Sequence, residues 1–96
     1  MYYTYVLYSE KDHGLYIGYS ANLKARFKQH SDGEVRSTAH RRSLILAYYE
    51  AYVYRKDAET RERFLKSGSG RTYLKKQMRE FFGIHPLRTA TTEKNQ

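Results

Sequence analysis

Residues 15–30 read LYIGYSANLKARFKQH, and this stretch decides the fold of the chain. Its first half alternates large side chains around a glycine and is typical of a β-strand. A glycine inside a strand usually marks a place where another group comes close to the backbone, so we expect such a contact at Gly18. The second half opens at Asn22, a favourable N-cap, and predicts a helix to about His30.

The predicted helix carries an apolar stripe bordered by cationic residues. On a helical wheel, Leu23 and Phe27 fall on one side. Arg26 and His30 are four residues apart and lie along the edge of that stripe. Lys24 falls on the outer face, where a solvated charge is ordinary. We therefore expect two cationic groups close to the buried side of this helix.

The preceding residues predict a partner strand. Residues 2–8 are rich in aromatic and β-branched side chains, and residues 9–14 have the composition of a turn. The two strands then form a hairpin, with Tyr5 and Tyr16 on neighbouring strands. Whether these two tyrosines share a face depends on the strand register, which the sequence leaves open.

The remaining segments complete the predicted architecture. Residues 44–54 are apolar or aromatic at both alternating sets of positions, which suggests a central strand covered on both faces, and strict alternation puts Leu46 and Tyr48 on one face. Asp57 is a plausible cap for a helix to about Lys66, which residues 67–70 end. A last helix over about residues 71–82 would turn the following apolar residues to the core: Leu74, Met78, Phe81 and Phe82.

We therefore predict an α+β fold, a small three-stranded antiparallel sheet flanked by helices. A chain of 96 residues suits one domain, which we place at residues 1–83, with a flexible tail over residues 84–96. The absence of cysteine excludes a disulfide framework and a thiolate zinc site. No apolar run approaches membrane-spanning length, so we expect a soluble, cytoplasmic protein without a membrane partner.

The charge of the chain points to a polyanionic partner. Lys and Arg number 18 against 10 Asp and Glu, which gives a formal net charge of +8. Such an excess most often indicates nucleic acid, and the 11 tyrosines could stack on bases as well as fill the core. An exposed basic loop is expected over residues 31–43. The predicted nucleic-acid contacts are Lys24, Arg36, His40, Arg41 and Arg42.

Four motifs in order resemble the GIY-YIG nuclease family. The second half of its signature is literal, Tyr16-Ile17-Gly18, and the first half is degenerate, Tyr3-Thr4-Tyr5, with Tyr5 at the functional position. The helix with Arg26 and His30, and the later helix with Glu62, are similar to the family's next two motifs. The resemblance spans residues 2–82.

The resemblance implies a divalent-metal-dependent endonuclease that hydrolyses phosphodiester bonds in DNA, structure-selective or nonspecific. Glu62 would bind one Mg²⁺ or Mn²⁺ ion and Arg26 would steady the phosphate. Tyr5 or Tyr16 would handle the water, with His30 as base or phosphate ligand. The family's loop histidine or tyrosine corresponds to His40, or else Ser37 or Thr38 takes its place. Alternatives are a catalytically silent nucleic-acid-binding module of the same fold and a protein that processes RNA.

Each site residue also has a purely structural explanation. Glu62 can pair with Lys66 one helical turn later, and Arg26 can cover the core with its methylene groups. The tyrosines can be packing residues, and His30 can be stabilised by the dipole at the end of its helix.

Overall fold

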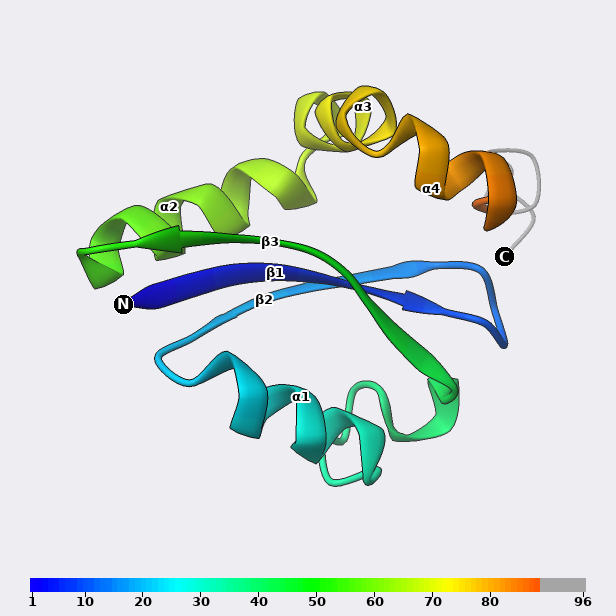
Figure 1. Cartoon of the computed structure of the whole chain (residues 1–96), viewed down its shortest axis with the longest axis horizontal. Helices are drawn as coiled ribbons and strands as arrows, with labels where there is room; N and C mark the ends of the chain where they lie inside the picture. The colour runs from blue at the N-terminus through cyan, green and yellow to red at the C-terminus, as the bar shows by residue number, and fades with distance from the viewer. Residues whose placement is uncertain (89–96) are drawn as a thin grey trace.

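An antiparallel sheet of three strands forms the centre of the computed structural model, which describes residues 1–88 (Figure 1). The spatial order is β2-β1-β3. The α+β fold predicted from the sequence is confirmed. The strands are β1 (Tyr2–Ser9), β2 (Leu15–Ser20) and β3 (Leu44–Tyr52).

The helices form one layer on each side of the sheet (Figure 1). One layer holds a single helix, which follows β2, and the other holds the three helices that follow β3. A short 3-10 turn precedes β3. These elements are α1 (Leu23–Ser31), the turn η1 (Ala39–Arg41), α2 (Arg55–Lys66), α3 (Gly68–Gln77) and α4 (Arg79–Ile84).

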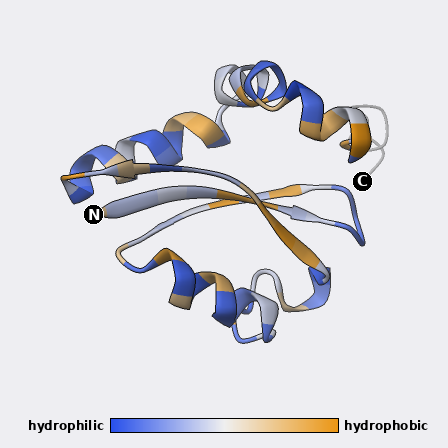
Figure 2. Ribbon diagram, viewed as in Figure 1, coloured by the Kyte–Doolittle hydropathy of each residue, from blue (hydrophilic) through white to orange (hydrophobic). Residues whose placement is uncertain are grey.

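The core lies between the sheet and the three-helix layer. It contains the buried side chains of Val6, Ile17, Leu65, Leu74 and Met78. In Figure 2 the hydrophobic colour gathers on the middle of β2, the first part of β3 and the end of α2. On the opposite side α1 buries only His30 completely, so this second layer covers the sheet less fully.

The central strand is β1, so the prediction that residues 44–54 form the central strand is wrong. All residues of β1 from Thr4 to Ser9 are buried, whereas β3 is an edge strand with Tyr49 53% exposed. The sequence of β3 looks central because one face packs on α2 and α3 while the other holds aromatic side chains that α1 covers only in part. Aromatic residues are common on such half-buried surfaces.

A β-bulge interrupts the alternation of β3. Val6 pairs with Tyr48 and Leu7 with Leu46, which leaves Ala47 without a partner on β1. Leu46 and Tyr48 therefore lie on opposite faces, contrary to the strict alternation expected from the sequence. Leu46 instead shares the α1 face with Tyr49, which stands opposite Tyr5. A bulge also increases strand twist, and β3 curves across β1 in Figure 1.

The helix boundaries after β3 differ from those expected. The N-cap of α2 is Tyr54, not Asp57, because the Tyr54 carbonyl oxygen accepts the first backbone hydrogen bonds of the helix. Asp57 lies in the first turn, where the helix dipole favours an acidic side chain. The last predicted helix is two helices, α3 and α4. The first of them begins at Gly68 instead of about residue 71, because the Ser67 side chain caps it by accepting a hydrogen bond from Gly70 N at 3.1 Å. The break falls at Met78.

The chain after α4 makes contacts in the expected tail. The Tyr8 hydroxyl donates to the Pro86 carbonyl at 2.7 Å, and Arg88 N donates to the His13 carbonyl at 3.0 Å. Residues 85–88 thus lie against the β1–β2 hairpin, and the remainder of the expected tail, 89–96, falls outside the described residues.

Within residues 1–88 no helix has the length and apolar character needed to cross a membrane. The expected cytoplasmic location stays a prediction.

Candidate active site

Tyr5 and Tyr16 lie on the same face of the sheet, the face that α1 covers. Tyr5 stands opposite Gly18 in the β1–β2 ladder, and Tyr16 stands opposite Leu7, two residues further along β1. Residues two apart on a strand share a face, so the register that the sequence left open brings the two rings together. Their centroids are 6.3 Å apart.

Gly18 provides the space that the Tyr5 side chain occupies. A Cβ atom added at Gly18 would lie 2.7 Å from the Tyr5 hydroxyl oxygen and 3.2 Å from a ring carbon of Tyr16. Any other residue here would push the Tyr5 ring aside. The close contact expected at this glycine is therefore confirmed, and the group that approaches is Tyr5.

Helix α1 brings His30 onto this tyrosine pair. Asn22 caps the helix by accepting a hydrogen bond from Ala25 N at 3.1 Å. Two turns later, His30 Nε2 lies 3.0 Å from the Tyr5 hydroxyl, and its ring centroid is 5.0 Å from that of Tyr16. The His30 side chain is completely buried.

Thr38 is the hydrogen-bond partner of His30 Nδ1. The Thr38 hydroxyl donates to the Val35 carbonyl at 3.5 Å and lies 2.7 Å from His30 Nδ1. Because this hydroxyl has one proton, we assign the ring proton to Nδ1, which donates to Thr38 Oγ1. Nε2 then accepts a hydrogen bond from Tyr5, so the three side chains form a directed hydrogen-bond chain.

His30 is neutral at physiological pH. Burial and, to a lesser degree, the positive charge of Arg26 lower the pKa of His30 to about 4. A neutral imidazole with its free lone pair on Nε2 can accept the Tyr5 proton. A neutral His30 does not fit the structural explanation in which the dipole at the helix end stabilises a charged histidine.

Arg26 lies on the edge of the α1 stripe, beside the tyrosine hydroxyls. Burial raises the pKa of the Tyr5 hydroxyl, and Arg26 opposes that rise. Interaction with Tyr5 in turn raises the pKa of Arg26, whose guanidinium also donates to Gln29 Oε1 at 3.1 Å. A fixed positive charge next to two hydroxyls suits an anion such as a phosphate.

Glu62 approaches the site from α2. Burial is the largest cause of the raised pKa of Tyr5, and the negative charge of Glu62 adds a minor contribution in the same direction. The side chain is 18% exposed and pairs with Lys66 Nζ at 3.2 Å. The pair with Lys66 that the sequence allowed is thus present, and the metal-binding role of Glu62 stays a prediction.

Glu62 is a single carboxylate, paired with Lys66. Among residues 1–88 no three His, Asp or Glu side chains gather as a metal cluster. A lone carboxylate can hold Mg²⁺ or Mn²⁺ when water and a substrate phosphate fill the rest of the coordination shell. Such a cation would compete with Lys66 for the Glu62 carboxylate.

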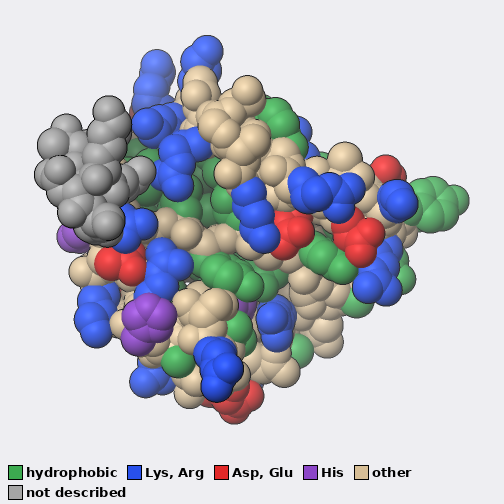
Figure 3. Space-filling model, turned by 180° about the vertical axis from the view of Figure 1, so that it is seen from behind, with side chains coloured by type: hydrophobic (Ala, Val, Ile, Leu, Met, Phe, Trp, Pro, Cys, Tyr) green, Lys and Arg blue, Asp and Glu red, His purple; other side chains and the backbone are tan. Residues whose placement is uncertain are grey.

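The predicted nucleic-acid contacts differ in their surroundings. Lys24, Arg36, His40 and Arg42 are exposed. The side chain of Arg41 is only 16% exposed, because its guanidinium binds the Asp12 carboxylate at 2.7 Å and joins the loop to the β1–β2 hairpin. Figure 3 shows that Lys and Arg side chains outnumber acidic ones over much of the face seen from behind.

The residue that sequence reasoning did not assign is Thr38. The loop position was left open between His40 and Ser37 or Thr38, and the structure places Thr38 against His30 while His40 is exposed. Nothing in the local pattern marks Thr38, since its role depends on a contact between residues eight apart across a loop.

Comparison with known proteins agrees with this arrangement. The family model of the GIY-YIG catalytic domain matches residues 1–77. The UPF0213 protein in the ldhD 5'region of Pediococcus acidilactici is 38% identical over 77 residues, with 77% of this chain and 78% of the relative covered. A UPF0213 protein of Bacillus licheniformis is 32% identical over 90 residues, covering 90% of this chain and 92% of the relative. No solved structure gives a significant match. The chain therefore belongs to the GIY-YIG family.

Proposed function

We propose that this protein is an endonuclease that hydrolyses phosphodiester bonds in DNA with one bound Mg²⁺ or Mn²⁺ ion. Family membership supports a nuclease function. The observation that carries the proposal is the hydrogen-bond chain from Tyr5 through His30 to Thr38, with Arg26 beside it. This chain can accept a proton from an attacking water next to a fixed positive charge.

In the proposed mechanism Arg26 binds the scissile phosphate and holds it beside Tyr5 and Tyr16. Tyr5 takes a proton from the attacking water while its own proton moves to His30 Nε2. Burial is the larger cause of the low pKa of His30, and the Arg26 charge is the smaller one. A phosphate bound to Arg26 offsets that charge, so His30 becomes a stronger base when substrate is present.

Glu62 would hold the metal ion, whose chemistry is to neutralise charge on the phosphate and on the departing oxygen. Tyr16 forms the wall that orients the phosphate, since its ring packs against both Tyr5 and His30. The alternative, a silent binding module, is favoured by one contact, the Lys66–Glu62 pair, which already satisfies the carboxylate.

The test is cleavage of duplex, single-stranded, flap and branched DNA, and of matched RNA, with Mg²⁺, Mn²⁺ or EDTA. Glu62→Gln removes the charge but preserves size and helix propensity. We expect it to abolish metal-supported cleavage while DNA binding persists or tightens, because a carboxylate without its metal repels phosphate. The matched control is Glu59→Gln on the same helix, which removes an acid bonded to Tyr19 and should leave the cleavage rate unchanged.

The outcomes separate the two readings. Cleavage by Glu62→Gln at the wild-type rate would refute the mechanism. Binding without cleavage of any substrate by the wild-type protein would leave the silent module as the function. Cleavage of RNA in preference to DNA would correct the substrate class.

A further inference from the structure

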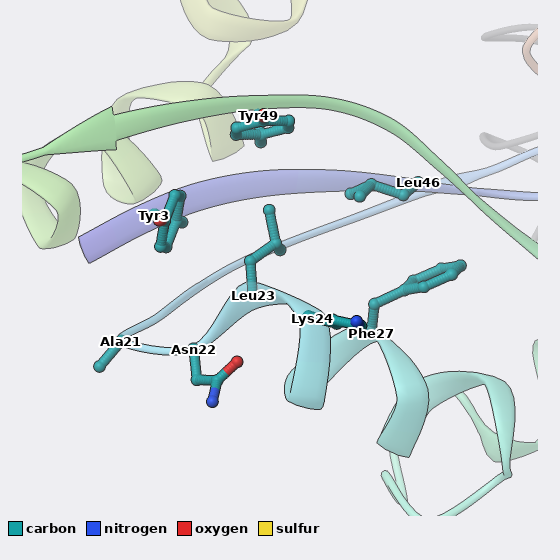
Figure 4. Close-up of a pocket in the computed structure, with 8 residues that line it drawn as sticks. All are labelled: Tyr3, Ala21, Asn22, Leu23, Lys24, Phe27, Leu46 and Tyr49. Carbon is teal, nitrogen blue, oxygen red and sulfur yellow. The ribbon is translucent and has the colours of Figure 1, made fainter. Parts of the chain in front are cut away.

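A groove lies between α1 and the face of the sheet that α1 covers only in part. Its volume is about 470 Å³, within the range of small-ligand sites. Figure 4 shows Tyr49 and Leu46 of β3 and Tyr3 of β1 on one wall, and Leu23 and Phe27 of α1 directed toward them from the other. None of these residues takes part in the proposed catalytic step.

The chemistry of the groove suits a flat aromatic ligand. Tyr49 is 53% exposed, and its ring meets that of Tyr3 edge-on with 6.0 Å between centroids. A flat, exposed ring supported from behind offers a stacking surface, and Phe27 adds a second ring to the lining. Aromatic faces of this kind hold unpaired bases without regard to sequence.

The charge around the groove favours a polyanion. Among residues 1–88 no acidic residue lines it. Lys24 stands in its lining, and Lys28 lines the adjoining hollow along α1. A second copy of the chain would bring another net charge of +8 against this rim, so electrostatics disfavours self-association here. In an unpaired nucleotide the base can stack on the aromatic rings, and the phosphate can pair with the lysine ammonium groups.

The groove adjoins the proposed catalytic centre. Tyr49 is the β3 partner of Tyr5, and paired strands are about 5 Å apart, comparable to the ~3.4 Å rise per nucleotide of a DNA strand. Lys24 and Arg26 flank the same stripe of α1 on opposite sides. A strand whose phosphate lies at Arg26 would therefore cross α1 to place a neighbouring base in the groove, where Lys24 stands.

We propose that this groove binds an unpaired nucleobase, with Tyr49 as the stacking residue, so that the protein prefers single-stranded or locally unpaired nucleic acid to intact duplex. The inference rests on the proposed function for the class of substrate. A base in an intact duplex is stacked on its neighbours and cannot enter unless it is first extruded.

The experiment measures binding in EDTA, so that it does not depend on cleavage. The probes are a fluorescent oligo-deoxythymidylate of about twelve nucleotides and a blunt duplex of the same length. Tyr49→Leu retains an apolar side chain but removes the ring, and Tyr49→Phe retains the ring. The control is Tyr54→Leu, at a tyrosine that is 70% exposed and lies outside the groove.

We expect Tyr49→Leu to bind the oligonucleotide about tenfold more weakly, with duplex affinity unchanged within about twofold, and Tyr49→Phe and Tyr54→Leu to bind like the wild-type protein. Wild-type affinity in Tyr49→Leu, an equal loss in Tyr54→Leu, or a change in oligomeric state on sedimentation would overturn the proposal. A wild-type protein that binds the oligonucleotide through Tyr49 but never cleaves DNA refutes the nuclease function and leaves the groove intact. If the wild-type protein cleaves DNA but Tyr49→Leu binds the oligonucleotide with unaltered affinity, the nuclease function stands and the groove proposal is refuted.

Discussion

At the scale of single residues, the site depends on groups whose partners lie far away in the sequence. Tyr5 contacts Gly18 on the next strand and His30 on a helix, and His30 in turn contacts Thr38 in a loop. The sequence marked the tyrosines, Arg26 and His30 as candidates, whose catalytic roles stay predictions, and Gly18 correctly predicted a close approach. The hydrogen-bond direction could not be predicted, because it depends on one loop hydroxyl.

The burial of neutral His30 predicts a pH-dependent stability. Its pKa of about 4 in the folded protein lies below the ordinary value of 6.5, so between these values only the unfolded chain binds this proton. The contribution to stability is complete above about pH 6.5 and is lost as the pH falls toward 4, by up to about 3 kcal/mol.

His30→Gln replaces the ring with a neutral amide that can still bond to Tyr5 and Thr38. Urea unfolding at about pH 4.5 and about pH 7 should show a smaller loss of stability at low pH in this variant than in the wild-type protein. His40→Gln, at an exposed histidine, is the control and should follow the wild-type curve. The same pH dependence in all three proteins would contradict the assignment of a neutral, buried His30.

At the scale of elements, the type of each helix and strand follows from its sequence, and the errors have physical causes. The bulge at Ala47 cannot be seen as a break in alternation because residues on both sides of it are apolar or aromatic. The break between α3 and α4 could not be seen in the sequence, because the apolar residues keep helical spacing across it. These residues are Leu74, Met78, Phe81 and Phe82. The turn at Met78 carries Phe81 onto Tyr8, with 5.4 Å between ring centroids.

The junction of α2 and α3 predicts a strict requirement for glycine at residue 70. A Cβ atom there would lie 1.9 Å from the Phe64 carbonyl oxygen and 2.5 Å from Leu65 Cα, so the backbone itself would have to move. Gly70→Ala should therefore lower the free energy of unfolding by about 3 kcal/mol or more, measured by thermal or urea unfolding.

Gly68→Ala is the matched control, because no atom of the described part of the chain lies within 4 Å of its added methyl group. It should leave stability unchanged or raise it by up to about 1 kcal/mol, through the lower entropy of the unfolded chain. Equal stability of the two alanine variants would show that α2 and α3 can separate without cost.

At the scale of the whole molecule, the net charge of +8 acts through spread surface residues, not through one cluster. Lys24 is exposed on α1, and Arg36 and Arg42 are exposed in the loop that precedes β3, whereas Arg41 is held by Asp12. The charge excess was visible in the sequence. The sequence could not show that Arg41, unlike its exposed neighbours, binds the β1–β2 hairpin, because its partner Asp12 is 29 residues away.

This distribution predicts binding that weakens steeply with salt. With about four phosphate contacts, duplex affinity should fall about a hundredfold between about 50 mM and about 200 mM monovalent salt, and single-strand affinity somewhat less. Titration of labelled DNA in EDTA at several salt concentrations gives the slope. Lys24→Met should lower the magnitude of that slope by the amount expected for about one lost phosphate contact. A flat response to salt would remove the electrostatic basis of binding.

The bulge in β3 also has a consequence for reading related sequences. Leu46 and Tyr49 share a face although they are three residues apart, because Ala47 has no partner on β1. A homologue with one residue fewer at this point can keep both halves of the strand in place, with the equivalent pair two residues apart. An alignment gap placed elsewhere in β3 would exchange the inward and outward positions of every residue between the gap and the bulge. The natural site for a length change in this strand is therefore residue 47, where evolution can insert or delete a residue without remodelling the groove.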